Sequence, residues 1–177
     1  MKTIYCLLGA SGSGKSTLGD YIKKELKIPE LISHTTRPKR RGEKQGDPYH
    51  FINQKQFFNI KMIERVDYSG NYYGLSQKEV ESKLENYNEV FVIIDKEGIR
   101  QLKRLYPNYV EVVYIYATLD ECLERMSNRT TEEILERVIN MVKDEELDNC
   151  DIADYIIRNK DLDKAKKQIR SIIRNID

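Results

Sequence analysis

The chain has few cysteines, no excess of charge of one sign and no long apolar run. Its three cysteines, Cys6, Cys122 and Cys150, are far apart and form no C-x-x-C pair, which favours reduced intracellular thiols over a disulfide framework or a metal site. Lysine and arginine number 30 and aspartate and glutamate 29, so a net charge of +1 gives no field that steers the protein to nucleic acid or to an anionic membrane. No window approaches a membrane span, and the apolar run after Lys2 is too short for a signal peptide. We therefore expect a cytoplasmic protein with neither nucleic acid nor a membrane as partner.

A glycine-rich stretch near the N-terminus is the most informative feature present. Residues 9–17 fit the phosphate-binding pattern G-x-x-x-x-G-K-[ST], between an apolar run at residues 4–8 and a helical pattern. The stretch consists of Gly9, Ala10, Ser11, Gly12, Ser13, Gly14, Lys15, Ser16 and Thr17. Glycines let successive backbone N–H groups surround an anion, and the following helix adds the positive end of its dipole. The pattern predicts a nucleoside triphosphate site rather than an ordinary surface turn. In that site Lys15 neutralises the β- and γ-phosphates and Ser16 binds Mg²⁺.

Runs of β-branched and aromatic residues alternate with helical patterns along the chain, which favours an α/β fold with a parallel sheet. The expected strands cover residues 3–8, 31–33, 90–94, 109–116 and 155–157. The expected helices cover residues 17–26, 76–86, 97–105, 118–126, 132–147 and 162–176. Ser76 with Glu79, and Thr118 with Glu121, have the spacing of capping boxes. Residues 34–50 predict a loop or small excursion, and 51–73 predict short strands around one helical turn.

Two polar segments resemble the signatures of the guanylate kinase family. One extends from Ser33 through Arg37, Arg40 and Glu43 to Phe51, and the other is Glu64 followed by Ser69-Gly70-Asn71-Tyr72-Tyr73-Gly74. The resemblance covers essentially the whole chain. It implies a P-loop NTPase three-layer sandwich with a parallel core sheet, a small excursion that binds the nucleoside monophosphate, and a helical lid.

The resemblance also implies how this single domain of residues 1–177 is divided and what it does. The core comprises residues 1–33, 76–125 and 138–177, the GMP-binding region residues 34–75, and the lid residues 126–137. The implied activity is that of an ATP:GMP phosphotransferase, which converts ATP and GMP to ADP and GDP with Mg²⁺ as cofactor.

Arginine and tyrosine side chains in the first polar segment suit a phosphate group. A guanidinium can grip two nonbridging oxygens with its planar fork, as expected for Arg37 and Arg40. The hydroxyls of Tyr49 and Tyr73 can donate to the same group. By similarity to the family these four side chains hold the acceptor phosphate, and Glu43 belongs to the same GMP site. Taken alone, the basic segment is equally compatible with a solvated loop.

Guanine presents the N1–H and the N2 amine as adjacent donors, which a carboxylate matches with two oxygens. Glu64 and Ser33 occupy the positions that read the base in the family. The alternative for Glu64 is an exposed carboxylate on a strand. Asp95 ends an apolar run, which is where P-loop proteins carry an acidic residue that holds Mg²⁺ through water. We therefore expect Ser16 and Asp95 to form the metal site.

Three arginines flank a polar break and resemble the lid arginines of the family: Arg125, Arg129 and Arg137. Aimed at a transferring phosphoryl group, they would stabilise the charge on its equatorial oxygens. The alternative is pairing with nearby glutamates on a helix surface. Asn159 and Asp161 resemble the segment that passes the adenine.

The chain departs from the family at the base-reading positions and in the lid. After Gly74 the family has Ser or Thr, but this chain has Leu75, with Ser76 one step later. Two residues before Asp95 the family has an acid, and this chain has Ile93. A base group left without its partner costs about 1–3 kcal/mol, so these changes weaken guanine discrimination by about tenfold or more. The stretch between Arg129 and Arg137 is several residues shorter than the usual lid of the family.

A P-loop ATPase with a macromolecular partner is an alternative, but it leaves the arginine and tyrosine residues unexplained. Two other functions stay open. One is a kinase of the same fold that acts on another small phosphate-bearing acceptor, which Leu75 and Ile93 favour. The other is a catalytically silent binding module of the guanylate kinase type, and the intact Gly14, Lys15 and Ser16 argue against it. ATP and GMP are the expected small-molecule partners, and we expect a monomer or a homodimer.

Overall fold

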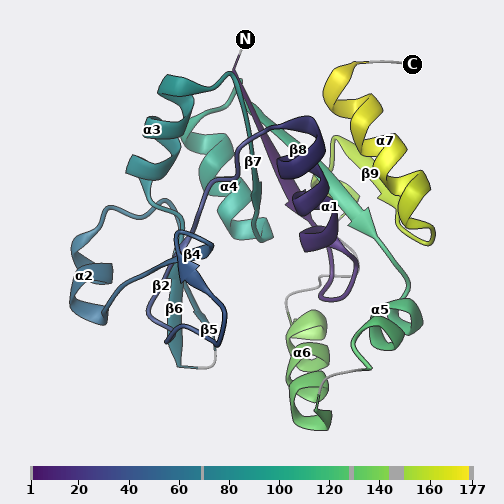
Figure 1. The fold of residues 1–177 in the computed structure, drawn as a ribbon, viewed down its shortest axis with the longest axis horizontal. Helices are drawn as coiled ribbons and strands as arrows, with labels where there is room; N and C mark the ends of the chain where they lie inside the picture. The colour runs from purple at the N-terminus through teal and green to yellow at the C-terminus, as the bar shows by residue number, and fades with distance from the viewer. Residues whose placement is uncertain (1, 69, 128–129, 144–149, 176–177) are drawn as a thin grey trace.

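A parallel sheet is the centre of the computed structural model, which describes residues 2–68, 70–127, 130–143 and 150–175 (Figure 1). Its strand order is β7-β1-β8-β9, and every neighbouring pair is parallel. The strands are β1 (Thr3–Leu8), β7 (Glu89–Ile93), β8 (Val110–Tyr116) and β9 (Tyr155–Arg158). The chain continues after β1 into a helix (Lys15–Tyr21) on one face of the sheet, and after the neighbouring β7 into a helix (Lys96–Leu105) on the other face. The loop after β1 therefore lies at the switch point where open α/β sheets bind ligands.

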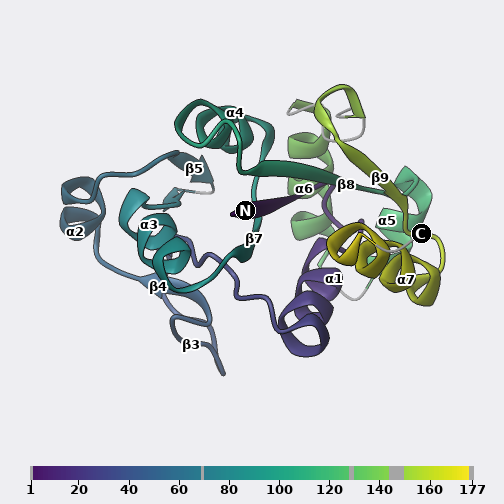
Figure 2. The ribbon, with the colours of Figure 1, turned by 90° about the horizontal axis from the view of Figure 1, so that it is seen from above.

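Helices cover both faces of this sheet, and Figure 2 shows α4 on one face with α1 and α7 on the other. Side chains alternate along β1 accordingly: Ile4 and Cys6 join the apolar cluster beneath α3 and α4, and Leu7 joins the cluster beneath α1 and α7. The helices are α1 (Lys15–Tyr21), the π-helix η1 (Ile22–Leu26), α3 (Gln77–Asn86), α4 (Lys96–Leu105) and α7 (Leu162–Arg174). This three-layer α/β arrangement confirms the predicted fold class and is consistent with a P-loop NTPase.

A second sheet of five strands, in the order β3-β4-β2-β6-β5, occupies the segment between β2 and β6. Its strands are β2 (His34–Thr35), β3 (Lys44–Gln45), β4 (Pro48–Phe51), β5 (Val66–Tyr68) and β6 (Asn71–Gly74), and α2 (Gln54–Asn59) lies within the segment. The central strand β2 is parallel to β4 and antiparallel to β6. Figure 1 shows this sheet below α3, beyond the carboxyl ends of the core strands.

Two helices follow β8 on the other side of the same edge: α5 (Leu119–Arg125) and α6 (Thr131–Lys143), with the 3₁₀ turn η2 (Cys150–Ile152) before β9. Buried Ala10, Cys122, Met126 and Met141 form a small apolar cluster that fastens the loop after β1 to α5 and α6. None of the helices in the described ranges combines the length and apolar character that crossing a bilayer demands.

The predicted strand at residues 31–33 is wrong. Leu31 donates its backbone N–H to the Phe91 carbonyl at 2.8 Å, but the chain then leaves the core sheet and first pairs as a strand at His34, opposite Gly74. The other predicted core strands are present with ends shifted by a residue or two. The predicted excursion at residues 34–50 contains three of the short strands of the second sheet.

The predicted helices are present, with differences at their ends and caps. The helix after the loop begins at Lys15 rather than Thr17, and its second half is a π-helix. The last residues of the two C-terminal helices, 144–147 and 176, lie outside the described residues. Thr118 and Glu121 form a complete capping box. At Ser76 only half of the box is made: its hydroxyl accepts from the Glu79 N–H, while the Glu79 carboxylate bonds to other partners.

Candidate active site

The loop after β1 closes around the first turn of α1. Gly14 caps the helix in the left-handed region, at φ 100°, and a Cβ at this position would collide with the Asn159 side chain. Lys15 donates from Nζ to the carbonyls of Gly9 and Ala10, at 2.6 and 2.9 Å. The ammonium group thus lies along the inner side of the loop, which is the position that its predicted role at the triphosphate requires.

A buried amide and a guanidinium support this loop from behind. Asn159 follows β9, is only 3% exposed, and donates from Nδ2 to the Ser13 carbonyl at 2.7 Å. Arg125 ends α5 and donates to the same carbonyl at 3.2 Å and to the Asn159 carbonyl. Both side chains therefore hold the loop backbone in shape. The predicted catalytic part of Arg125 and the predicted adenine contact of Asn159 stay predictions.

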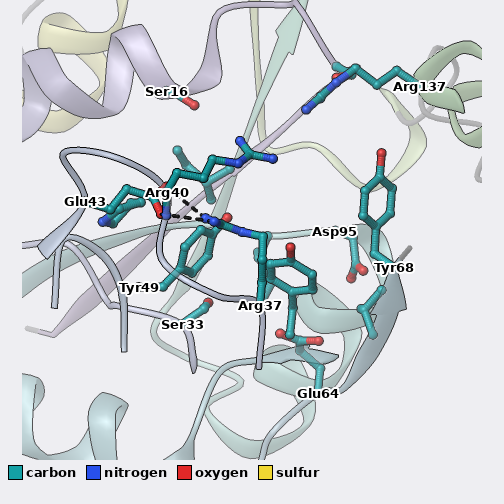
Figure 3. A pocket seen from close by; sticks show the side chains of 16 residues that line it. Ser16, Ser33, Arg37, Arg40, Glu43, Tyr49, Glu64, Tyr68, Asp95 and Arg137 are labelled. Atoms are coloured by element: carbon teal, nitrogen blue, oxygen red, sulfur yellow. Dashed lines mark hydrogen bonds and ion pairs between the residues drawn. The ribbon is translucent and has the colours of Figure 1, made fainter. Parts of the chain in front are cut away.

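A cavity of about 520 Å³ lies between the loop and the second sheet (Figure 3). The phosphate loop contributes its serines. The segment that holds the second sheet contributes arginines, tyrosines and Glu64. Asp95, which follows β7, and Arg137 on α6 complete the lining. The lining residues are Ser11, Ser16, Ser33, Arg37, Arg40, Glu43, Pro48, Tyr49, Glu64, Val66, Tyr68, Tyr73, Ile93, Ile94, Asp95 and Arg137. Two loop serines, the residues predicted to bind the acceptor and the predicted metal ligands thus face one space, whereas Lys15 lines a neighbouring cavity.

Arg37 and Arg40, the two arginines predicted to bind the acceptor phosphate, differ in the contacts that fix their side chains. Arg37 forms a two-point ion pair with Glu43, at 2.9 and 3.0 Å, and its guanidinium lies 5.8 Å from the Tyr49 ring centroid. This pairing raises the pKa of Arg37 and lowers the pKa of Glu43. Glu43 also accepts the backbone N–H of Arg40 at 2.7 Å. Figure 3 shows the Arg40 side chain extending toward the middle of the cavity, while Glu43 orients Arg37 at its wall.

Three tyrosines form one wall of the cavity. The rings of Tyr49 and Tyr73 meet edge to face at 5.6 Å, and Tyr68 meets Tyr73 at 6.4 Å. Burial raises the pKa of Tyr49, so its hydroxyl remains a hydrogen-bond donor at neutral pH. This wall supplies donors for an anionic group and a flat apolar surface beside it.

Glu64 carries the most strongly perturbed carboxyl group of the cavity lining. Its Oε1 accepts the Leu75 N–H at 3.0 Å, and its Oε2 is buried with no hydrogen-bond partner among the described residues. Burial, and next the charge of Asp95, raise the pKa of Glu64 to about 7. A buried acceptor atom without a partner is costly unless something fills the cavity and donates to it.

Oxygen atoms suited to a hard divalent cation lie near the loop. Ser16 lies in the first turn of α1, and Asp95 caps α4 by accepting the Gly98 N–H at 2.7 Å. Both side chains are exposed and line the cavity. The described residues contain no group of three or more His, Cys, Asp and Glu side chains that could hold a metal ion without help. An ion here would share its coordination with water and with the phosphates of a nucleotide.

The lid arginines lie in different places. Arg137 on α6 donates to the Ser11 hydroxyl at 2.6 Å, and Figure 3 shows its guanidinium pointing into the cavity from the side opposite the acceptor arginines. Arg129 lies outside the described residues. Asp161 caps α7 by accepting the N–H groups of Asp163 and Lys164, and it is exposed.

The sequence comparisons agree with this geometry. The family model described as guanylate kinase matches residues 1–176. The chain belongs to the guanylate kinase family. A guanylate kinase of Carboxydothermus hydrogenoformans is 38% identical over 174 residues, which cover 93% of this chain and 84% of that protein. One of Fusobacterium nucleatum is 33% identical, covering 97% of this chain and 96% of its own.

Solved structures are also similar. The crystal structure of a guanylate kinase from Anaplasma phagocytophilum matches with a TM-score of 0.72 and 23% identity, over 98% of this chain and 85% of that one. At this identity the match shows the shared fold.

The structure explains the two departures from the guanylate kinase signature differently. The Leu75 side chain is fully buried in the core, so it packs away from the cavity while its N–H holds Glu64. Ser76 caps α3 and cannot serve as its replacement. Ile93, by contrast, lines the cavity, so an apolar surface stands where the family places an acid.

Sequence reasoning missed several lining residues, chiefly Val66, Tyr68 and Ile94. A signal was present for two of them, because Val66 and Tyr68 alternate along β5 and so share one face of the second sheet. Without knowing which face meets the loop, that alternation does not separate lining residues from core residues.

Proposed function

We propose that this protein catalyses the ATP-dependent phosphorylation of GMP to GDP. The observation that carries the proposal is that one cavity joins a phosphate-binding loop to a pair of arginines and to a buried carboxylate, one oxygen of which has no hydrogen-bond partner within the described ranges. A kinase for a nucleoside monophosphate needs these three elements to face each other. Membership of the guanylate kinase family supports the same activity.

In the proposed acceptor site, Arg37, Arg40, Tyr49 and Tyr73 bind the phosphate of GMP. Glu43 holds Arg37 in a fixed orientation, so less side-chain freedom is lost when the phosphate binds. Glu64 accepts from guanine N1–H and N2–H, which satisfies the buried oxygen, and Ser33 lies in the same cavity to contact the base.

The loop binds ATP through its backbone N–H groups and Lys15. A phosphate oxygen of GMP attacks the γ-phosphorus, and the bond to the β–γ bridging oxygen breaks, so ADP leaves with that electron pair. No covalent intermediate with the protein is needed, because positioning and charge neutralisation carry the rate. We assign Arg137, Arg125 and Arg129 to the charge that develops on the transferred group. Of these, Arg137 already points into the cavity.

We propose Mg²⁺ as the cofactor, held by Ser16 and, through water, by Asp95. A hydroxyl and a carboxylate are the hard oxygen donors that Mg²⁺ prefers, and both are exposed at the cavity. When bound, the ion neutralises phosphate charge and polarises the γ-phosphoryl group.

We further propose that residues 34–75 form the GMP-binding region and residues 126–137 the lid, within a single domain. The second sheet and Arg137 on α6 support this division. Nothing in the comparisons favours another acceptor or a silent module. A cytoplasmic site of action and a monomer or homodimer complete the proposal.

The test is a coupled assay of ADP release with Mg·ATP against GMP, dGMP, IMP, AMP, CMP and UMP. We expect strong turnover of GMP and little of AMP. Lys15→Ala should abolish transfer, because it removes the ammonium group that we place at the triphosphate, and a denaturant titration of the variant checks that the fold is intact. Preferred turnover of a monophosphate without the guanine edge would refute the proposal.

A further inference from the structure

A carboxylate outside the cavity connects a core helix to strand β4 of the second sheet and to the segment that precedes β2. Glu79 lies in the first turn of α3 and is 13% exposed. Its Oε1 accepts the backbone N–H of Ile32 at 3.0 Å, and its Oε2 lies 3.3 Å from Nε2 of His50 on β4. Figure 1 places α3 directly above the second sheet, so this side chain spans the junction between the two parts.

Each partner of Glu79 is next in the chain to a residue of the acceptor site. Ile32 precedes Ser33, and His50 follows Tyr49, and both Ser33 and Tyr49 line the cavity. The His50 backbone N–H also donates to the Ser33 carbonyl at 2.9 Å. A closed ring of contacts therefore joins α3, the entry to β2 and β4.

His50 also contacts a second histidine. His34 on β2 packs against the His50 ring with the ring centroids 4.8 Å apart, although the His50 side chain stays 30% exposed. Both oxygens of Glu79 have a partner outside α3. The carboxylate does this instead of closing the capping box with Ser76 that its sequence spacing predicts.

We propose that Glu79 is the positioning residue of the acceptor site: through Ile32 and His50 it sets where Ser33 and Tyr49 stand relative to the phosphate loop. This inference rests on the proposed function. Glu79 does not line the cavity, so its loss should weaken capture of the acceptor nucleotide through Ser33 and Tyr49 and leave ATP binding by the phosphate loop unaffected.

The experiment compares Glu79→Ala, Glu79→Gln and a control, Glu81→Ala, in steady-state assays that vary GMP and ATP separately. Glu81 lies on the same helix, is exposed, and bonds only locally to Gln77. We expect Glu79→Ala to raise KM for GMP about tenfold or more and to change KM for ATP less than about twofold. The KM for GMP of Glu79→Gln should stay within about threefold of that of the unmodified protein, because an amide can accept from the Ile32 N–H and donate to a ring nitrogen of His50.

Distinct results would overturn the inference. An unchanged KM for GMP in Glu79→Ala, equal increases in both KM values, or a glutamine variant no better than alanine would each do so. If Glu79→Ala does not fold, His50→Ala removes one arm only and must still raise KM for GMP selectively. If the unmodified protein does not turn over GMP, both the proposed function and this inference are refuted. If it turns over GMP but Glu79→Ala does not raise the KM for GMP selectively, only this inference is refuted.

Discussion

The buried carboxyl group of Glu64 should make both stability and acceptor binding depend on pH near neutrality. Its pKa is raised from an ordinary value of 4.5 to about 7, first by burial and then by Asp95. The folded protein therefore binds this proton more tightly than the unfolded chain does. The contribution of Glu64 to the free energy of unfolding is fully present below pH 4.5. This contribution falls by about 3 kcal/mol in total as the pH rises through about 7.

The variant Glu64→Gln has no such proton to release. We expect the free energy of unfolding of Glu64→Gln, relative to the unmodified protein, to increase by about 2 kcal/mol between pH 5 and pH 8. Denaturant titrations at several pH values measure this difference. Glu85→Gln, which changes an exposed carboxylate on α3, should show no such trend.

Acceptor binding should respond in the opposite direction, because guanine N1–H and N2–H donate to the ionised form of Glu64. Calorimetric titration with GMP, without ATP or Mg²⁺, should show an affinity advantage of the unmodified protein over Glu64→Gln that grows with pH up to about 7. The phosphate of GMP itself titrates near pH 6 but does so equally in both proteins. A pH-independent difference in unfolding free energy would refute the reasoning about burial. A pH-independent affinity ratio would refute the role of Glu64 at the base.

Four further substitutions test the cavity and the residues that support it. Arg40→Ala should raise KM for GMP about tenfold or more with little effect on ATP binding, and an unchanged KM for GMP in steady-state assays would show that the acceptor phosphate lies elsewhere. Ile93→Asp should increase the ratio of kcat/KM for GMP over IMP by about tenfold, because a carboxylate at the cavity wall gives the N2 amine a second acceptor. Leu75→Thr should leave this ratio unchanged and cost about 2–4 kcal/mol in denaturant unfolding, because the side chain is buried in the core. Asn159→Ala should lower the free energy of unfolding in denaturant titrations by only about 1 kcal/mol, because Arg125 still donates to the Ser13 carbonyl. A much larger decrease would mean that Arg125 does not support the loop independently.

The sequence predicts the elements whose signal is local. Continuous apolar runs mark β1 and β7, because a strand buried on both faces needs apolar side chains at every position. Thr118 and Glu121 mark the start of α5 by a capping box that is closed within four residues of chain. The phosphate loop is likewise a local pattern of glycines, Lys15 and Ser16.

Sequence patterns do not predict features that depend on contacts with residues distant in the chain. The segment at residues 31–33 has the composition of a strand, yet it bonds to β7 only briefly and leaves for the second sheet. Glu79 has the spacing of a capping box, but Ile32 and His50 compete successfully for its carboxylate. Leu75 stands at a position that contacts the base in the family, and only its burial shows that its side chain faces the core.

The sequence by itself determined the α/β fold class and the phosphate-loop pattern, and it predicts which arginines bind the acceptor phosphate, because each of these signals lies in a short run of residues. The tertiary structure alone decided how these side chains act together. It joined Glu43 to Arg37, left one oxygen of Glu64 buried without a partner in the part of the chain that the structure describes, and turned Ile93 into the cavity while Leu75 packs into the core. These outcomes depend on how two sheets meet across many residues of intervening chain, and no local pattern encodes the burial or the electrostatic field that such a meeting creates.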